Sequence, residues 1–495
     1  MPPAREQTLL ALECGDGSPD VGAQSARHNP ETRAAPGAPF YRGSALLTSQ
    51  QSGISGDKSP CLRTLAEELA DFHEFGQPTR RITTRFSGGE IPTFVNEFWT
   101  ARQRQASSLH EVSYRACFKP QLPRFFIERL TQPCDVVYDP FMGRGTTPVE
   151  AALLGRVPWG NDVNPLSLTF SRPRLYPPTL DEIAAGLKRI NLSDYDEFPE
   201  DLLVFYHPET LGEICALKKY FLSRRDRERV HAASLSEASA VTKGAGTTAS
   251  PRRSGPKSTL LDSVDDWLCM VALNRLTGHS PGFFSVYTLP PNQAVSIQSQ
   301  RKINQKRNQI PPRRDVAKLI RKKSRQLLSD VSPAVRATLA QIADCARFID
   351  SPADSTSELP ANSVSLVVTS PPFLDVVQYA DDNWLRCWFL GIDPKSVKLT
   401  VPKKLANWAA AMTSVFRELH RVLKTGGHVA FEVGEVHGGK TKLEETVLPC
   451  GGAAGFEPVV VLINDQKFTK TANCWGVDNM AKGTNTNRIA LFRKP

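Results

Sequence analysis

The sequence predicts an α/β fold in which helices cover a mostly parallel sheet. Residues 135–165 run through a short β-rich segment ("DVVYDPF"), a glycine loop leading into an Ala/Leu-rich helix ("GRGTTPVEAALLGR") and a second strand ("VPWGNDVNP"). This is the pattern of a βαβ unit, which builds a parallel sheet. The rhythm resumes near residue 340 with the strand "SVSLVVTS", the helix "WAAAMTSVFRELHRVLKTGG" and the strands "HVAFEVG", "FEPVVVLIND" and "NRIALF".

Composition indicates a soluble globular protein. Of the 495 residues, 40% are hydrophobic and 23% are charged, and no apolar run approaches the ~20 residues that span a bilayer. The ten cysteines include no C-x-x-C pair, which favours reduced thiols in a cytoplasmic protein over disulfides or a metal site. The net charge of +10 suits a polyanionic partner but also occurs in ordinary soluble proteins.

The chain divides into four expected regions. Residues 1–60 are rich in Gly, Ser, Pro and Ala and read as a disordered leader. Residues 61–170 carry the glycine loop, preceded by helical patterning over 62–130. Residues 171–338 interrupt the α/β rhythm as a largely helical, basic insert with a flexible loop near 224–257, and residues 339–495 complete the sheet.

The glycine loop is a candidate cofactor site. Gly143 and Gly145 lie between a strand and a helix, where they let the backbone turn tightly and let a ligand approach it. No Lys follows them and no third Gly completes a dinucleotide fingerprint, whereas Asp162 ends the next strand and can accept hydrogen bonds from ribose hydroxyls. A cofactor with a ribose and no phosphates fits, and S-adenosylmethionine is the obvious one; the alternative is a simple tight turn.

A second candidate site is the segment Ser370, Pro371, Pro372 and Phe373, which ends a predicted core strand. Two prolines stop the strand and stiffen the backbone that follows. Ser370 and the Pro371 carbonyl can accept hydrogen bonds from an exocyclic amine, and Phe373 can stack on the ring that carries it. That describes a nucleobase taken out of its helix. The alternative is a strand stop with Phe373 in the core.

Together these motifs resemble the DNA amino-methyltransferases, which modify N4 of cytosine or N6 of adenine. "DPFMGRGTT" with "GNDVNP" resembles the cofactor motif of that family, "TSPPF" its catalytic motif [DNS]-P-P-[YFW], and "HEVSYRACFKPQLPRFFI" the segment that contacts the methionine part of the cofactor. The match covers roughly residues 105–170 and 340–495. It implies a Rossmann-like class I methyltransferase fold with a seven-stranded sheet, and S-adenosyl-L-methionine as cofactor.

The resemblance also implies roles for individual residues. Ser370, Pro371, Pro372 and Phe373 are the expected catalytic residues. The expected cofactor contacts are Tyr114, Lys119, Pro120, Asp139, Pro140, Phe141, Gly143, Gly145, Thr146, Thr147, Asp162, Asn164 and Asp344. Serine at the first motif position is typical of cytosine-N4 enzymes, whereas adenine enzymes more often carry Asp or Asn.

One departure concerns the order of the motifs. The wording "DPF-x-G-x-G-T-T" is common where the catalytic half comes first, whereas here the cofactor half comes first and a long insert follows. By analogy we place target recognition in the insert. The expected DNA contacts lie in its most basic stretch, residues 301–325, with a solvated loop and helix face as the equal alternative. The candidates are Arg301, Lys302, Lys306, Arg307, Arg313, Arg314, Arg321 and Lys322.

The expected function is a site-specific DNA methyltransferase acting on cytosine N4 in double-stranded DNA, by base flipping and direct attack. A restriction endonuclease for the same site is a possible partner. The alternatives are an adenine-N6 enzyme, an RNA or protein methyltransferase, and a DNA-binding protein without catalysis. Methylation at carbon 5 would require a cysteine nucleophile, and Cys134 precedes the cofactor strand instead of lying in a Pro-Cys loop. Lys467, Trp475, Asn485 and Asn487 are further candidates for the base pocket.

Overall fold

The fold is described from a computed structural model. It describes residues 64–100, 106–114, 117–242, 263–288, 294–372, 379–397, 402, 404–436, 441–465 and 486–495. For residues 227–242, 379–380 and 435–436 only the backbone is described. The expected disordered leader 1–60 lies outside these residues, as does Phe373.

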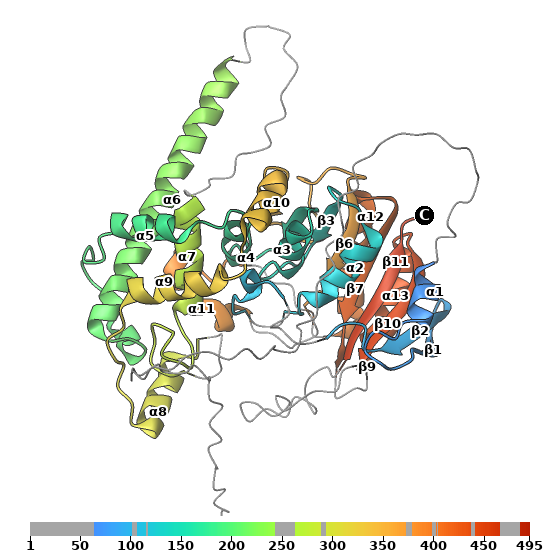
Figure 1. The fold of residues 1–495 in the computed structure, drawn as a ribbon, viewed down its shortest axis with the longest axis horizontal. Coiled ribbons are helices and arrows are strands. Elements are labelled where there is room, and N and C mark those ends of the chain that lie inside the picture. The colour runs from blue at the N-terminus through green and yellow to red at the C-terminus, as the bar shows by residue number, and fades with distance from the viewer. Residues whose placement is uncertain are drawn as a thin grey trace, which may run out of the picture. The chain divides into compact units, whose positions relative to one another are not determined.

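A nine-stranded sheet forms the centre of the fold (Figure 1). Five neighbouring pairs are parallel (β2–β10, β7–β6, β6–β3, β3–β4 and β4–β5) and three are antiparallel, which confirms the mostly parallel α/β fold. In spatial order the strands are β1 (Arg80–Phe86), β2 (Gly89–Asn96), β10 (Glu457–Asp465), β11 (Thr486–Arg493), β7 (Leu423–Val433), β6 (Val364–Thr369), β3 (Val136–Asp139), β4 (Val157–Asn161) and β5 (Arg347–Ile349). A separate ribbon pairs β8 (Glu435–Val436) with β9 (Thr441–Lys442).

The strand order confirms the expected Rossmann-like class I fold. Numbered along the chain from β3, the seven strands from β10 to β5 have the spatial order 6-7-5-4-1-2-3, and only the seventh is antiparallel to its neighbours. Chain order reverses between β3 and β6, so the crevice at their carboxyl ends is where an open α/β sheet binds ligands.

Two strands were not expected. The helical pattern predicted for residues 62–130 is borne out by α1 (Leu65–Ala70) and α2 (Gln121–Leu130), but it is wrong for residues 80–96, which form the β1–β2 hairpin at the sheet edge. The segment "RITTRF" is rich in β-branched side chains, and Gly89 adopts a φ of +137° beside the turn. The hairpin extends the expected sheet beyond β10.

Helices pack on both faces of the sheet. Tyr138 of β3 shares one core with α12 (Leu405–Val422) and α13 (Leu443–Ala453), whereas its neighbour Val137 shares another with α1, α2 and α3 (Thr146–Leu153). This alternation is the period of a strand that is covered on both sides. The sheet is therefore buried except at its carboxyl edge and its end strands.

The insert is helical, as expected, with no sheet strand among the described part of residues 171–338. It shares one hydrophobic core with α4 (Leu166–Ser171) and α11 (Tyr379–Leu390). Its helices are α5 (Leu180–Arg189), α6 (Pro208–Thr242), α7 (Ser263–Arg275), α8 (Ile297–Arg307), α9 (Val316–Leu327) and α10 (Pro333–Ala343), with short 3-10 helices at Arg172–Leu175 and Glu200–Val204. A further 3-10 helix, η2 (Ser108–His110), precedes the glycine loop.

The flexible loop expected near 224–257 is wrong in its first part, because α6 continues to Thr242. Residues 224–242 include four Arg, four Ala and two Glu, which favour helices even in a low-complexity sequence. The remainder of that segment is outside the described chain. No described helix combines the length and apolar character needed to cross a membrane.

Candidate active site

The two predicted motifs meet at the carboxyl edge of the sheet. Asp139 ends β3 and Thr369 ends β6, and the Thr369 hydroxyl donates a hydrogen bond of 2.6 Å to Asp139 Oδ1 across 230 residues of sequence. On the same side, the Thr147 hydroxyl of α3 donates to the carbonyl of Val368 at 3.0 Å. The glycine loop and the Ser-Pro-Pro segment are therefore joined directly.

Glycine is required in the loop between β3 and α3. Gly143 and Gly145 have φ angles of +51° and +77°, in the left-handed region. A Cβ on Gly145 would overlap the Ser171 hydroxyl, whereas one on Gly143 would lie 3.6 Å from the ring of Tyr114. The expected cofactor contact Tyr114 thus lies beside the loop.

The Asp162 carboxylate supports the same loop. It accepts hydrogen bonds of 2.9 Å from the backbone N–H groups of Gly143 and Asn164. A carboxylate offers about four acceptor positions, so capacity remains for ribose hydroxyls. Burial raises the pKa of Asp162, and the two backbone N–H donors oppose that shift.

Asn161 ties three strand ends together and was not predicted. Its fully buried amide donates to the carbonyls of Pro140 at 3.2 Å and Ser351 at 2.9 Å, and its Oδ1 accepts from the Ser351 N–H at 3.0 Å. It thereby fixes Pro140 after β3 and Ser351 after β5.

The structure does not bring Asp344 to this edge. Asp344 is the exposed C-cap of α10 and precedes β5, so it lies toward the opposite end of the strand. Asp350 directly follows β5, whose last residue Ile349 pairs with Asn161. The acidic side chain that follows this strand at the carboxyl edge is therefore Asp350.

Thr146 and Phe141 lie in or beside the loop, whereas Lys119 and Pro120 come from the segment before α2. The buried Thr146 hydroxyl accepts from Arg144 Nε at 3.2 Å, and the Phe141 N–H donates to Asp139 at 3.0 Å. Pro120 is the N-cap of α2, and burial together with the charge of Arg144 lowers the pKa of the neighbouring Lys119.

The Ser370 hydroxyl contacts a buried carboxylate. Thr369 pairs with Phe431 of β7, so Ser370 and Glu432 come next along the same edge, where the Ser370 side chain is close enough to Glu432 to influence the pKa of its carboxyl group. Glu432 is 5% exposed and also accepts from Asn487 Nδ2 at 2.9 Å. Burial raises the pKa of Glu432 to about 7, against the opposing effect of the Ser370 and Asn487 hydrogen bonds.

Glu432 was not predicted as a site residue, because "HVAFEVG" has the pattern of an ordinary strand. The signal that could have revealed it is a Glu near the carboxyl end of a strand whose other side chains are apolar. An ionisable group in such a strand is buried only where it has partners.

A tryptophan holds the two-proline turn. The indole N–H of Trp408, a fully buried residue of α12, donates to the Pro372 carbonyl at 3.0 Å. Pro371 is buried, whereas Phe373 lies outside the described residues. Of the other base-pocket candidates, Asn487 donates a hydrogen bond to Glu432, the neighbour of Ser370. Lys467, Trp475 and Asn485 fall in a segment that is not described.

Asp139 and Glu432, the two carboxylates nearest the junction of the motifs, both have raised pKa values. Burial also raises the pKa of Asp139 to about 7, despite hydrogen bonds from Thr369 and the Phe141 N–H. Strongly raised carboxyl pKa values in a strand-end crevice are typical of functional sites. Within the described ranges, no three His, Cys, Asp or Glu side chains are grouped to hold a metal ion.

The expected DNA contacts in the insert are partly engaged. Arg301 forms an ion pair of 3.0 Å with Asp201, Arg313 pairs with Glu209 and Glu213, and the Arg307 guanidinium lies 3.8 Å from the ring centroid of Tyr287. The backbone N–H of Arg314 donates to Thr210 at 2.8 Å, and Lys302 and Lys306 are exposed.

Comparison with known proteins gives sequence similarity at the glycine-loop segment. A family model described as DNA methylase, for the N6/N4 methyltransferases, matches residues 84–167, the segment from β1 to the start of α4 that contains the glycine loop. The chain is also 35% identical over 98 residues to the Type II methyltransferase M.MvaI of Kocuria varians, a match that spans 19% of this chain and 20% of that protein.

Solved structures give weaker matches. One is TTHA0409, a putative DNA modification methylase from Thermus thermophilus in complex with S-adenosyl-L-methionine, with 22% identity, 28% of this chain and 50% of that chain covered, and a TM-score of 0.16. Another is TrmN from Thermus thermophilus, with 11% identity, coverage of 85% and 61%, and a TM-score of 0.28. At such TM-scores the likeness carries no weight, and the fold class rests on the strand order.

Proposed function

We propose that this protein is a DNA methyltransferase that transfers a methyl group from S-adenosylmethionine to the N4 amine of cytosine in double-stranded DNA. The observation that supports this most is the hydrogen-bonded junction between the glycine loop and the Ser-Pro-Pro turn, through Asp139 and Thr369. A cofactor at the loop and an amine at Ser370 would lie side by side. The similarity of residues 84–167 to DNA methylases supports the same function.

The residues of the loop fit the proposed cofactor. Gly143 and Gly145 keep the backbone open beside Tyr114, while Asp162 and Asp350 follow adjacent strands and offer acceptors for the hydroxyls and amine of a nucleoside. S-adenosylmethionine supplies an activated methyl on a sulfonium. The chain has to position the amine in line with that methyl and accept its proton.

Ser370 and the Pro371 carbonyl are the proposed acceptors for the amine. The Pro372 carbonyl already accepts a hydrogen bond from Trp408, which fixes the turn. The Pro371 carbonyl is therefore the proposed backbone acceptor for the amine. When Glu432 is ionised, it can accept a hydrogen bond from the Ser370 hydroxyl. The lone pairs of the Ser370 oxygen are then directed at the amine. The proton released by the amine can pass through Ser370 to Glu432. Phe373 is proposed as the stacking face for the flipped base.

The test is methyl transfer by Ser370→Ala. We expect transfer to duplex DNA to fall about 100-fold, while the calorimetric affinity for S-adenosylmethionine stays unchanged. Ser365→Ala is the matched control, because Ser365 lies on the same strand and its hydroxyl donates instead to Asp135 at 2.7 Å. A Ser370→Ala rate equal to that of the wild type would contradict the proposed base pocket.

The proposal includes base flipping, site specificity and a cognate restriction endonuclease as a partner. Serine in the catalytic motif favours cytosine N4 over the alternative, adenine N6. An RNA or protein substrate is the less favoured alternative.

A further inference from the structure

Helix α9 has two faces of different character. The face packed into the insert core carries Val316, Ile320, Ser324 and Leu327, which are fully buried. Trp267 of α7 donates to the Ser324 hydroxyl on this face at 3.0 Å. The opposite face carries four exposed cations at positions i, i+3, i+4 and i+7, namely Lys318, Arg321, Lys322 and Arg325, which we call the outer row.

The outer row differs from Arg301 and Arg313 of the basic stretch. Arg301 and Arg313 are matched by acidic side chains. No residue of the outer row forms an ion pair with any side chain that the structure describes, and α9 holds like charges four residues apart at Lys318 and Lys322 and at Arg321 and Arg325. Such pairs destabilise a helix unless anions neutralise them. The outer row is therefore available to an anionic partner.

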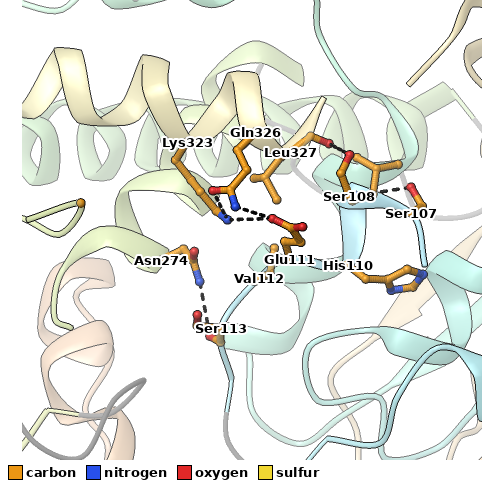
Figure 2. Close-up of polar contacts among 12 residues, drawn as sticks. Ser107, Ser108, His110, Glu111, Val112, Ser113, Asn274, Lys323, Gln326 and Leu327 are labelled. Atoms are coloured by element: carbon orange, nitrogen blue, oxygen red, sulfur yellow. Dashed lines mark hydrogen bonds and ion pairs between the residues drawn. The ribbon is translucent and has the colours of Figure 1, made fainter. Parts of the chain in front are cut away.

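Side chains and backbone of α9 contact residues 108–111, the segment that leads to Tyr114 beside the glycine loop (Figure 2). Gln326 donates to Glu111 at 2.5 Å, and the buried Lys323 lies 3.8 Å from the same carboxylate. The Ser108 hydroxyl donates to the Leu327 carbonyl at 2.9 Å.

The same segment is held from a second helix. Asn274 of α7 donates to the Ser113 carbonyl at 3.4 Å, and Ser113 directly precedes Tyr114, whose ring lies beside Gly143. The outer row thus belongs to a helix anchored to the segment that borders the proposed cofactor site.

We propose that the outer row of α9 binds the phosphodiester backbone of the DNA substrate, which rests on the function proposed above. The row covers about 10 Å at 1.5 Å per residue, the axial span of about three successive phosphates of one strand at 3.4 Å each. A membrane surface fits poorly, because the apolar face of α9 is buried in the core and unavailable for insertion.

The test replaces the outer row by glutamine, as Lys318→Gln, Arg321→Gln, Lys322→Gln and Arg325→Gln together. Binding of a fluorescein-labelled 30-bp DNA duplex is followed by anisotropy between 50 and 200 mM salt. Each phosphate contact contributes about −0.9 to the slope of log K against log salt, so the slope should become shallower by about 2–4 and the affinity at 50 mM salt should fall at least tenfold.

The control removes the same charge elsewhere, as Arg80→Gln, Lys395→Gln, Arg417→Gln and Arg493→Gln, which are exposed residues on other elements. It should retain most of the wild-type slope and affinity. Both variants must keep the wild-type melting curve in far-UV circular dichroism and the wild-type calorimetric affinity for S-adenosylmethionine. If the outer-row variant loses its melting transition and its cofactor affinity, the row has a role in folding and the proposal is overturned.

The outcomes separate this proposal from the proposed function. If the wild type binds and methylates DNA but the outer-row variant keeps its slope, the role of α9 is wrong and the function stands. If the wild type neither binds nor methylates DNA, both fail. Tighter binding of an RNA duplex than of DNA by the wild type would overturn the choice of DNA.

Discussion

In the proposed mechanism, Glu432 determines the direction in which the Ser370 hydroxyl points. A hydroxyl both donates and accepts, so the nature of its neighbour decides which role is left for a substrate. Glu432 is buried on β7 and shared between Ser370 and Asn487. Only its ionised form leaves Ser370 as an acceptor for the amine.

This predicts a pH dependence of methyl transfer. Because burial raises the pKa of Glu432 to about 7, the ionised fraction and hence kcat should rise between pH 6 and pH 8. Glu432→Gln should lower kcat about tenfold or more and flatten that rise, with the affinity for S-adenosylmethionine unchanged. Steady-state kinetics at constant ionic strength measure both. If Glu432→Gln keeps the wild-type pH profile, the rise belongs to another group, such as Asp139, and the proposed role of Glu432 is wrong.

At the same scale, sequence reasoning picked out some residues of the candidate site and not others. Gly143, Gly145 and Ser370 stand out because glycine turns and proline stops are local signals. Asp344 was predicted and Asp350 was not, because the sequence alone does not show where the short strand Arg347–Ile349 begins. Asn161 and Glu432 depend on pairing between distant strands, which local patterns do not encode.

At the scale of single elements, the loop before α3 predicts a contrast between two glycines. Gly145→Ala should destabilise the protein by at least about 1–2 kcal/mol, because it forces a Cβ into the left-handed region and against Ser171. Gly452→Ala in α13 meets open space and should stabilise it by about 0.5–1 kcal/mol.

Urea unfolding of both variants measures this difference, and calorimetry should also show weaker S-adenosylmethionine binding for Gly145→Ala alone. Equal stability of the two variants would show that the loop does not need its left-handed glycine.

Elements with strong periodicity were predicted well, and those decided by context were not. The strands β3, β4, β6, β10 and β11 follow the expected segments. The expected helix at α12 is confirmed only as far as Val422, because residues 423–427, predicted as its glycine-closed end, begin β7. The β1–β2 hairpin was not predicted, because it is stabilised by the pairing of β2 with β10. That strand is distant in sequence, so the local pattern does not reveal the pairing. Helix α6 was cut short in the prediction because composition alone was read as flexibility.

At the scale of the whole molecule, the insert and the α/β domain share their interior. One core cluster includes Phe170 of α4, Trp267 of α7, Ile320 of α9 and Leu385 of α11. Residues 62–495 also form one compact unit. The target-recognition role proposed for the insert is therefore built into the body that holds the cofactor loop.

This predicts a single cooperative unfolding transition. Tryptophan fluorescence and far-UV circular dichroism should give the same urea midpoint, because Trp267 in the insert and Trp408 against the sheet are both fully buried within the same compact unit. Two separated midpoints would show that the insert folds as an independent domain.

The central claim is tested most directly by the product of the reaction. Purified protein is incubated with S-adenosylmethionine and unmethylated duplex DNA, and the DNA is digested to nucleosides for mass spectrometry, with Ser370→Ala as the matched blank. The account predicts N4-methylcytosine that is absent from the blank. N6-methyladenine would contradict the choice of cytosine, and the absence of any methylated nucleoside would contradict the proposed function itself.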